Sequence, residues 1–425
     1  MNTFGLCKKV NLTVIPSTKF KTNYLSVNFV MNLSDKNATN ASLLSRILTK
    51  GCEKYKNISL LEKRLEYLYD MTLSISTVKR GENLILTYAA DFLKDEYISG
   101  ESLLDSAVDM FENVTFEPLA ENGAFDKEIF EIAKSELENA INSLLNNKTA
   151  LAKQKCTQIM CQNEPYAVSE LGSIETLNKI TPVSLYEFYL DFIKTAPVEI
   201  YFTGSANESG LCKSFERVFS KFERNPKEID KTKIEIFDKI NVKEKSEKMH
   251  INQGKLSMGF RTGAGISKNN AAATLVFCDI FGSSPTSKLF MNVREKKSLC
   301  YYCSSSCDIY KGVMFVNSGI DAKNKEKTQK AVLCELENMK NGKITDEEMH
   351  FAKLSLKNDL RGLSDNPYAY MFWHLSRSIN GSDITCDEFA KEIDNVKVQD
   401  VVNVASGVKL DTVFFLDAIL EKEGE

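Results

Sequence analysis

Three cysteines, Cys300, Cys303 and Cys307, stand in the segment LCYYCSSSCDIYKG with C-x2-C-x3-C spacing. Clustered thiolates can hold zinc or an iron–sulfur centre. The segment is typical of a β-strand, in which successive side chains point to opposite faces. Cys303 and Cys307 would then share one face and Cys300 would point to the other. We therefore expect no metal here, and an enzyme with its own thiol- or metal-based chemistry stays an alternative interpretation.

The chain has only three histidines, His250, His350 and His374, and none has a second histidine four residues away. Neither of the paired-histidine zinc helices, H-E-x-x-H and H-x-x-E-H, is therefore present. We expect His350 to be a surface residue of a helix and His374 to pack beside Trp373. The sequence also lacks the G-x-S-x-G and phosphate-loop patterns. No catalytic residue, metal or cofactor is expected from these motifs.

The composition excludes several classes of protein. The 425 residues include 54 Lys and Arg and 58 Asp and Glu, a formal net charge of −4, which gives no reason to expect nucleic-acid binding. No apolar run has the length of a membrane span, and the first residues do not resemble a signal peptide. Eleven cysteines at irregular spacing suggest reduced thiols, so a cytoplasmic protein is expected.

Two distant segments have the same pattern, LSVNF at 25–29 and LSMGF at 256–260. Each alternates apolar and polar residues, as half-buried strands do. The offset of 231 residues continues without a gap to Gly51 and Gly282, through the helix-like stretches NASLLSRILTKG and AAATLVFCDIFG. The chain is therefore interpreted as one structural unit written twice.

The correspondence continues along both halves. Each half has a candidate hairpin with a glycine at its turn, Gly81 and Gly312. A long amphipathic helix follows, the second one opened by a capping box of Thr345 and Glu348. Each half then closes with a helix and a strand. This order predicts an α+β fold in two similar halves, each a mostly antiparallel sheet with helices packed on one face.

The halves are expected to be separate domains. We predict an N-terminal domain over residues 1–223 and a C-terminal domain over 254–425. Residues 224–253 are rich in Lys and Glu and poor in large apolar residues, so they are interpreted as a charged, solvated linker.

One long stretch carries a family resemblance. Residues 283–320, SSPTSKLFMNVREKKSLCYYCSSSCDIYKGVMFVNSGI, resemble the second-domain signature of the insulinase/pitrilysin zinc metallopeptidases, and residues 164–189 are similar to a segment of that family's first domain. The family has two similar α+β halves, so the resemblance implies a clamshell arrangement.

The resemblance implies a substrate role for Arg294 and Tyr301. A guanidinium can donate a fork of hydrogen bonds to peptide carbonyls or to a C-terminal carboxylate, and a phenol can donate to a developing oxyanion. The alternative is architectural, with Arg294 as a surface ion-pair residue and Tyr301 as a core strand residue.

Active members of this family carry H-x-x-E-H on the first helix, before a Lys-Gly segment. Here that helix reads NASLLSRILTKGCEKY, so the metal-ligand positions fall on Ser42 and Arg46 and the general-base position on Ser45. These side chains cannot replace two imidazoles and a carboxylate at zinc. The third ligand would lie on the helix with Glu136 and Glu138, in a register that the sequence does not fix. We expect an inactive member that does not hydrolyse peptides alone.

Inactive family members occur beside an active paralogue, so the resemblance implies a heterodimer with a zinc-bearing metallopeptidase paralogue and a peptide or unfolded polypeptide as substrate. Residues 60–82, LLEKRLEYLYDMTLSISTVKRGE, are similar to a bacterial cytoplasmic subgroup associated with modification of elongation factor P. A purely structural subunit is the remaining alternative. Neither nucleic acid nor a membrane span is expected.

Overall fold

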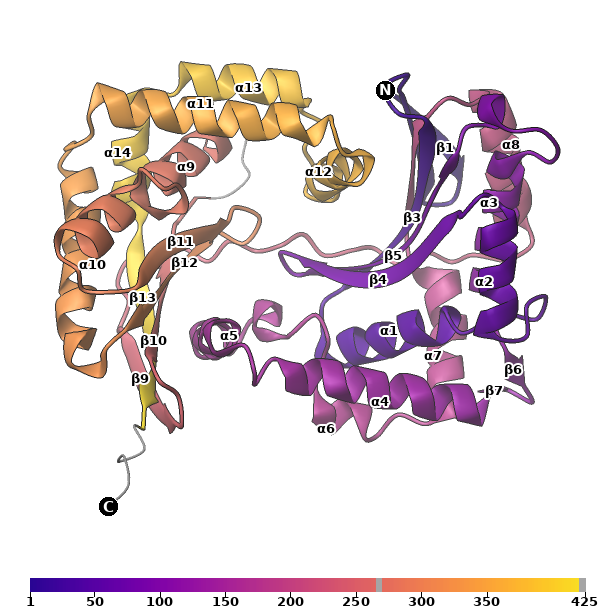
Figure 1. Cartoon of the computed structure of the whole chain (residues 1–425), viewed down its shortest axis with the longest axis horizontal. Coiled ribbons are helices and arrows are strands. Elements are labelled where there is room, and N and C mark those ends of the chain that lie inside the picture. Colours follow the sequence, from indigo (N-terminus) through magenta and orange to yellow (C-terminus); the bar gives the residue numbers. More distant parts are fainter. Residues whose placement is uncertain (265–269, 420–425) are drawn as a thin grey trace. The chain divides into compact units, whose positions relative to one another are not determined.

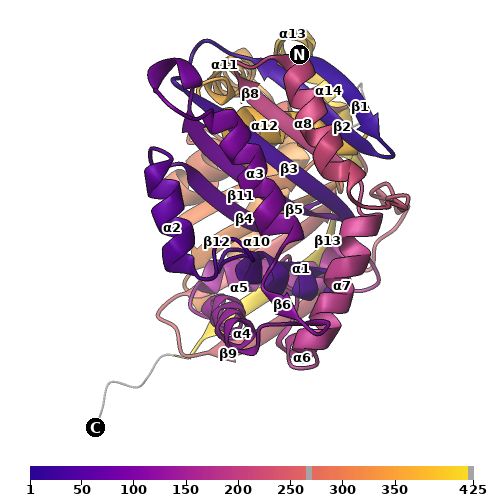
Figure 2. The ribbon, with the colours of Figure 1, turned by 90° about the vertical axis from the view of Figure 1, so that its right-hand side faces the viewer.

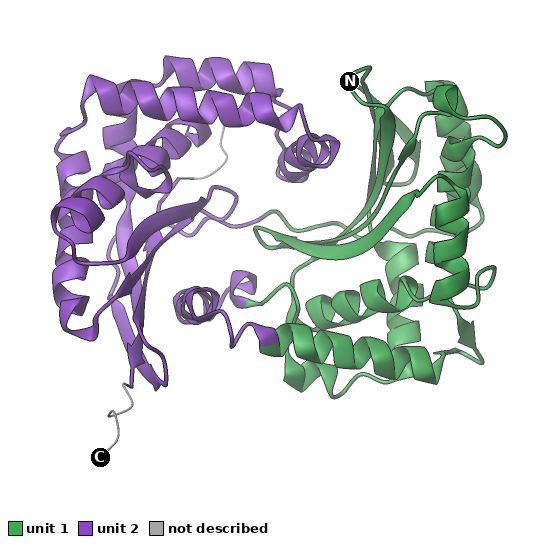
Figure 3. Ribbon diagram, viewed as in Figure 1, with its two compact units in different colours: residues 1–142, 168–231 green, residues 143–167, 232–425 purple. Residues whose placement is uncertain are grey.

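The computed structural model describes residues 1–264 and 270–419. The chain divides into two compact units, which Figure 3 colours separately. Unit 1 consists of residues 1–142 and 168–231, and unit 2 consists of residues 143–167 and 232–425.

Unit 1 is built on a six-stranded sheet with the order β1-β2-β8-β3-β5-β4. Neighbouring strands are antiparallel except β2 and β8, which are parallel. The strands are β1 (Asn2–Cys7), β2 (Val10–Pro16), β3 (Thr22–Asn32), β4 (Thr72–Arg80), β5 (Asn83–Leu93) and β8 (Val198–Gly204).

Helices cover one face of this sheet, with α2, α3 and α8 in front of the strands in Figure 2. Alternate residues of β3, Leu25, Val27 and Phe29, are fully buried in the core beneath them, as strand periodicity requires. The remaining elements of unit 1 are α1 (Asp35–Leu48), α2 (Ile58–Tyr67), η1 (Asp95–Tyr97), α3 (Leu103–Phe116), β6 (Ala120–Glu121), β7 (Ala124–Phe125), α4 (Lys127–Ser143), α6 (Ile174–Leu177), α7 (Pro182–Thr195) and α8 (Glu208–Ser220).

Unit 2 is built on a five-stranded sheet with the order β11-β12-β10-β13-β9. The pair β13 and β9 is parallel and the other pairs are antiparallel. The strands are β9 (Lys243–Met249), β10 (Gly254–Arg261), β11 (Tyr302–Asp308), β12 (Val313–Ile320) and β13 (Lys409–Ala418).

Helices pack on both faces of the second sheet. One face packs against the helices of the second half (Figure 1), and the other face packs against α5 from the first half of the sequence. The elements are α5 (Lys148–Met160), η2 (Pro165–Ala167), α9 (Ala271–Cys278), η3 (Asp279–Ser283), η4 (Leu289–Lys296), η5 (Ala322–Asn324), α10 (Lys325–Lys340), α11 (Asp346–Leu363), α12 (Pro367–Ile379), α13 (Cys386–Asn395) and α14 (Val398–Gly407).

Five strands of the first sheet follow the same order as the five strands of the second, and β1 is an additional edge strand. Strands β2-β8-β3-β5-β4 of unit 1 correspond, in chain order and direction, to β9-β13-β10-β12-β11 of unit 2. Both hairpin glycines take positive φ, 53° at Gly81 and 69° at Gly312, and the capping box of Thr345 and Glu348 forms. The predicted α+β class with mostly antiparallel sheets is confirmed. The prediction of helices on one face of each sheet is wrong for the second sheet, because α5 covers its other face.

The unit boundaries differ from the predicted domains 1–223 and 254–425. Residues 143–167 group with unit 2 because α5 buries its apolar side on the second sheet. The segment 224–253 is also not a linker throughout, since residues 243–249 form β9 beside β13. At its start, the buried Arg224 donates to the carbonyl of Ile193 at 2.6 Å, so this end belongs to unit 1.

No helix within residues 1–264 and 270–419 is both long and apolar enough to cross a bilayer.

Candidate functional site

Helix α1 carries the three positions that were compared with a zinc motif. Its N-terminus is capped by Ser34, whose hydroxyl accepts a hydrogen bond from the amide of Asn37 at 3.1 Å, and Asp35 lies in the first turn. The spacing of 42, 45 and 46 places these residues on neighbouring positions of one helical surface. The helix is therefore well formed, and the residue types decide its chemistry.

The two serines use their hydroxyls inside unit 1. Ser42 is fully buried, donates to the carbonyl of Glu170 at 2.9 Å and lies 3.0 Å from the hydroxyl of Thr77. Ser45 donates to the carbonyl of Ser42 at 2.9 Å. Both hydroxyls thus satisfy protein groups and are poor zinc ligands in any case.

A cation and an ion pair complete this site. Arg46 donates to the carbonyl of Ser42 at 2.7 Å, and burial lowers the pKa of its guanidinium while the charge of Glu136 opposes that effect. Lys50 binds the same Glu136 carboxylate at 2.6 Å. The α4 carboxylate that faces α1 is therefore Glu136, a register that the sequence left open.

This set of residues does not fit zinc. Two hydroxyls and a guanidinium offer no imidazole or carboxylate ligand, and the nearby carboxylate is neutralised by Lys50. In the described part of the chain, no group of three or more His, Cys, Asp or Glu side chains has the arrangement of a metal site. No hydrolytic step follows from α1.

Arg294 lies in η4 of unit 2 with its side chain 38% exposed. Its guanidinium stacks over the ring of Phe290, 4.5 Å from the centroid, and its Nε is 3.5 Å from the carboxylate of Glu295. The ion pair is long and partly solvated, so it restrains the guanidinium only weakly. The side chain keeps donors that another molecule can reach.

Tyr301 lies just before β11 and is 63% exposed. Its amide donates to the carbonyl of Gly319 at 2.9 Å, which fixes the backbone, while the phenol is 3.5 Å from the carboxylate of Asp321. An exposed residue before the strand differs from the core strand residue of the architectural alternative. The substrate role of Arg294 and Tyr301 stays a prediction.

The three clustered cysteines form two separate thiol contacts. Cys300 lies before β11, where a hydrogen bond with Cys303 lowers the pKa of its thiol against the effect of burial, aided by the charge of Arg294. The thiol of Cys307 instead forms a hydrogen bond with the thiol of Cys278. The expectation that a strand would turn Cys300 away from Cys303 is wrong, because the strand begins at Tyr302. None of the eleven cysteines, all of which lie within the described residues, forms a disulfide.

The histidines are placed as expected. His374 is buried on α12, edge-on to Trp373 with ring centroids 5.0 Å apart. Burial, followed by the charge of Arg377, lowers its pKa to about 4. His350 is exposed on α11.

Sequence reasoning missed two groups of buried charges in unit 2. One is Arg377, which lies between the rings of Trp373 and Phe389 at 4.3 and 4.1 Å from their centroids. The W-x3-R spacing on a helix could have indicated this contact. The second is a network around Glu164. Its members come from four segments that lie far apart in the sequence, so no local sequence pattern predicts it. It comprises Glu164, Arg261, Lys311 and Asp411.

Comparison with known proteins agrees with the absence of zinc ligands on α1. Residues 179–356 match the family model described as "Peptidase M16 inactive domain". A Bacillus subtilis (strain 168) protein named "Probable inactive metalloprotease YmfF" is 28% identical over 404 residues, covering 95% of this chain and 94% of that protein. "Uncharacterized zinc protease YmxG" of the same strain is 26% identical over 239 residues, covering 55% and 57%.

A solved structure is also similar over its full length. The crystal structure of a conserved protein from Enterococcus faecalis V583 has a TM-score of 0.93 and 30% identity, covering 99% of both chains. The fold, the matched family model and the relatives that align over nearly the whole chain all indicate the same family. The chain belongs to the insulinase/pitrilysin (M16) peptidase family, as a member without the zinc motif.

Proposed function

We propose that this protein is a non-catalytic subunit that pairs with a zinc-bearing M16 paralogue and contributes peptide-binding surface through Arg294 and Tyr301. The zinc would come from the partner, and this chain would supply hydrogen-bond donors for a peptide or unfolded polypeptide.

The observation that carries the proposal is a contrast between the two units. In unit 1, Ser42 is buried and hydrogen-bonded, and Arg46, at the position that the family resemblance assigns to a second metal ligand, donates to the carbonyl of Ser42. In unit 2, the side chains of Arg294 and Tyr301 remain accessible. Loss of the metal chemistry together with accessible donors suits a subunit that binds substrate without cleaving it.

The relatives support the pairing of an inactive member with a zinc-bearing member. One Bacillus subtilis strain has both a relative named as an inactive metalloprotease and a relative named as a zinc protease. A member named as inactive and a member named as a zinc protease, both from one strain, are the two kinds of component that the proposal needs.

Affinity capture tests the pairing. The tagged full-length chain is purified from its native cells at physiological salt, and the proteins that come with it are identified by mass spectrometry. We expect an H-x-x-E-H relative near one-to-one stoichiometry, with about one zinc per pair. A chain recovered alone, with a monomer mass in native mass spectrometry, would contradict the pairing.

Substitutions in the pair test the role of the two side chains. We expect Arg294→Ala and Tyr301→Phe to reduce peptide cleavage by the pair about tenfold or more, since hydrogen bonds to charged groups contribute about 1.5–3 kcal/mol. Arg361→Ala, at an exposed arginine of α11, is the matched control and should leave cleavage unchanged. If all three variants cleave equally, this chain is a structural subunit.

The finer assignment, to modification of elongation factor P, is supported by the resemblance of residues 60–82, which form α2 and β4. Deleting the gene should then change the intact mass of elongation factor P, and the wild-type copy should restore it. An unchanged mass removes this assignment and leaves the pairing proposal standing.

A further inference from the structure

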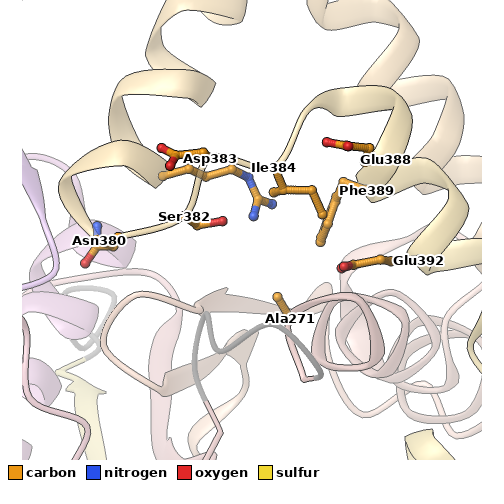
Figure 4. A pocket seen from close by; sticks show the side chains of 10 residues that line it. Ala271, Asn380, Ser382, Asp383, Ile384, Glu388, Phe389 and Glu392 are labelled. Atoms are coloured by element: carbon orange, nitrogen blue, oxygen red, sulfur yellow. The ribbon is translucent and has the colours of Figure 1, made fainter.

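A cavity of about 580 Å³ lies within unit 2, between α12, α13 and the N-terminus of α9. Figure 4 shows Ser382 and Ile384 on one side of it, Phe389 and Glu392 on another, and Ala271 opposite. The volume is in the range of ligand pockets. It is separate from the helix that carries Ser42 and Arg46 and does not include Arg294 or Tyr301.

The cavity contains a buried cation with an unsatisfied donor. Arg377 lines it and is only 3% exposed, and its buried Nε has no hydrogen-bond partner among residues 1–264 and 270–419. The rings of Trp373 and Phe389 hold the guanidinium between them. Buried guanidinium N–H groups are costly when unsatisfied, so this fork of donors is positioned for an acceptor from outside the chain.

The end of α9 adds a second feature that favours an anion. Ala271, the first residue of α9, lines the cavity, and no described side chain caps this N-terminus. The first amides of a helix have no intrahelical acceptor, and the helix dipole is positive at this end. Arg377 and the helix N-terminus come from different elements and favour the same charge.

The opposite charge is also present. Asp383, Glu388 and Glu392 line the same cavity, so carboxylates outnumber the one guanidinium. Glu388 is already engaged, because it accepts hydrogen bonds from the amide and hydroxyl of Thr385 at 2.9 and 2.8 Å. Glu392 forms no hydrogen bond with a described residue. Burial lowers the pKa of Arg377, and the nearby Tyr310, Cys386 and Glu392 oppose this effect.

A ligand that suits this cavity carries one negatively charged group for Arg377 and one positively charged group for the carboxylates. A phosphate dianion would be repelled by the surrounding carboxylates, whereas a carboxylate is a singly charged, planar partner for a guanidinium fork. A cationic group on the same ligand would then meet Glu392. The volume exceeds what one amino acid needs, so more than one residue fits.

We propose that this cavity binds the C-terminal α-carboxylate of a short peptide ending in Lys or Arg, with the carboxylate at Arg377 and the basic side chain at Glu392. The site goes beyond the proposed pairing and does not depend on it.

Calorimetric titration of the full-length chain tests the proposal with five probes. We expect the dipeptide Ala-Lys to bind, and Ala-Lys amide and Ala-norleucine to bind about tenfold or more weakly, because each lacks one charged contact. Inorganic phosphate should bind more weakly than Ala-Lys. Free L-lysine carries the same carboxylate and ammonium groups as the end of Ala-Lys. If it bound as tightly as Ala-Lys, the site would be one for the amino acid and not for a peptide.

Three variants locate the binding. Arg377→Gln should abolish the preference for Ala-Lys over its amide, and Glu392→Gln should abolish the preference over Ala-norleucine. Arg361→Gln, at an exposed arginine outside the cavity, should change neither. Circular dichroism checks each fold, and Glu392→Gln, at a partly exposed position, keeps the test valid if Arg377→Gln does not fold.

Five results would overturn the proposal. They are no binding of Ala-Lys at millimolar concentration, equal binding of the amide, equal binding of free L-lysine, tighter binding of phosphate, and full binding by a folded Arg377→Gln variant.

Discussion

The family resemblance assigns Ser42 to the position of a zinc ligand, and its environment is that of a packed structural residue. Its hydroxyl supplies the carbonyl of Glu170 with a donor, and the side chain is fully buried. Ser42→Ala should lower the free energy of unfolding by about 1 kcal/mol, the net contribution of one hydrogen bond. Ser42→His should cost more, about 1–3 kcal/mol from overpacking alone. Urea unfolding monitored by circular dichroism measures both.

Ser45→Ala is the control for this pair of variants. Ser45 donates only to a carbonyl of its own helix, at 2.9 Å, so its loss leaves no carbonyl of another segment without a donor. We expect a change within about 0.5 kcal/mol. If Ser42→His left the free energy of unfolding unchanged, position 42 would have room for the imidazole of a metal ligand.

His374 gives the stability of the protein a defined pH dependence. Burial and the charge of Arg377 lower its folded-state pKa to about 4, from the usual 6.5 of an imidazole. The unfolded chain therefore binds more protons between these values, and stability is lost as the pH falls from 6.5 towards 4. Between pH 7.5 and 5 the loss is about 2 kcal/mol. His374→Phe should flatten this part of the curve, as measured by urea unfolding at a series of pH values.

The exposed His350 serves as the comparison for that experiment. His350→Phe should leave the slope between pH 7.5 and 5 as it is in the wild type. If His374→Phe also leaves it unchanged, the imidazole of His374 is not the group that titrates.

At the scale of elements, a buried charge network holds the end of the α5 segment on the second sheet. Glu164, beyond α5, accepts from Arg261 of β10 at 3.0 Å and pairs with the fully buried Lys311 at 2.6 Å. Burial raises the pKa of Glu164, but these hydrogen bonds outweigh it and hold the pKa below its usual value. Glu164→Gln removes the carboxylate charge that Arg261 and Lys311 share. The carbonyl of Lys233, which also accepts from Lys311, is neutral and does not replace that charge. We therefore expect a loss of about 3–5 kcal/mol in unfolding free energy.

The same helix provides a matched surface pair. Lys155 of α5 and Glu247 of β9 are 3.5 Å apart and partly exposed, so Glu247→Gln should cost less than about 1 kcal/mol. Thermal and urea denaturation compare the two variants. Similar losses for both would mean that burial does not amplify the Glu164 network.

The sequence predicts elements well where the determinants are local. Period-two alternation located β3 and β10, and glycines located both hairpin turns, because strand and turn geometry depend on neighbouring residues. It failed for α5 and β9, whose place in unit 2 is decided by partners distant in the chain. The register of Glu136 and the burial of Arg377 likewise depend on tertiary packing, which a single sequence does not encode locally.

At the scale of the whole molecule, the chain passes between the units at three points, after residues 142, 167 and 231. A fragment of residues 232–425 would therefore lack α5 and expose the apolar sheet residues that α5 covers. These are Val313, Phe315, Phe414 and Leu416. Exposed apolar surface of this kind promotes association.

We expect the fragment 232–425 to bind a hydrophobic dye and to form oligomers, and a synthetic peptide of residues 143–167 to reverse both effects. A peptide with Leu151→Asp is the control, because Leu151 is buried against the sheet and a charge there has no partner. A fragment cut at the predicted boundary, 254–425, also lacks β9 and leaves an edge of β13 unpaired, so it should respond less to the peptide. Light scattering and dye fluorescence measure these responses, and a monomeric, dye-free fragment 232–425 would mean that the second sheet is stable without α5.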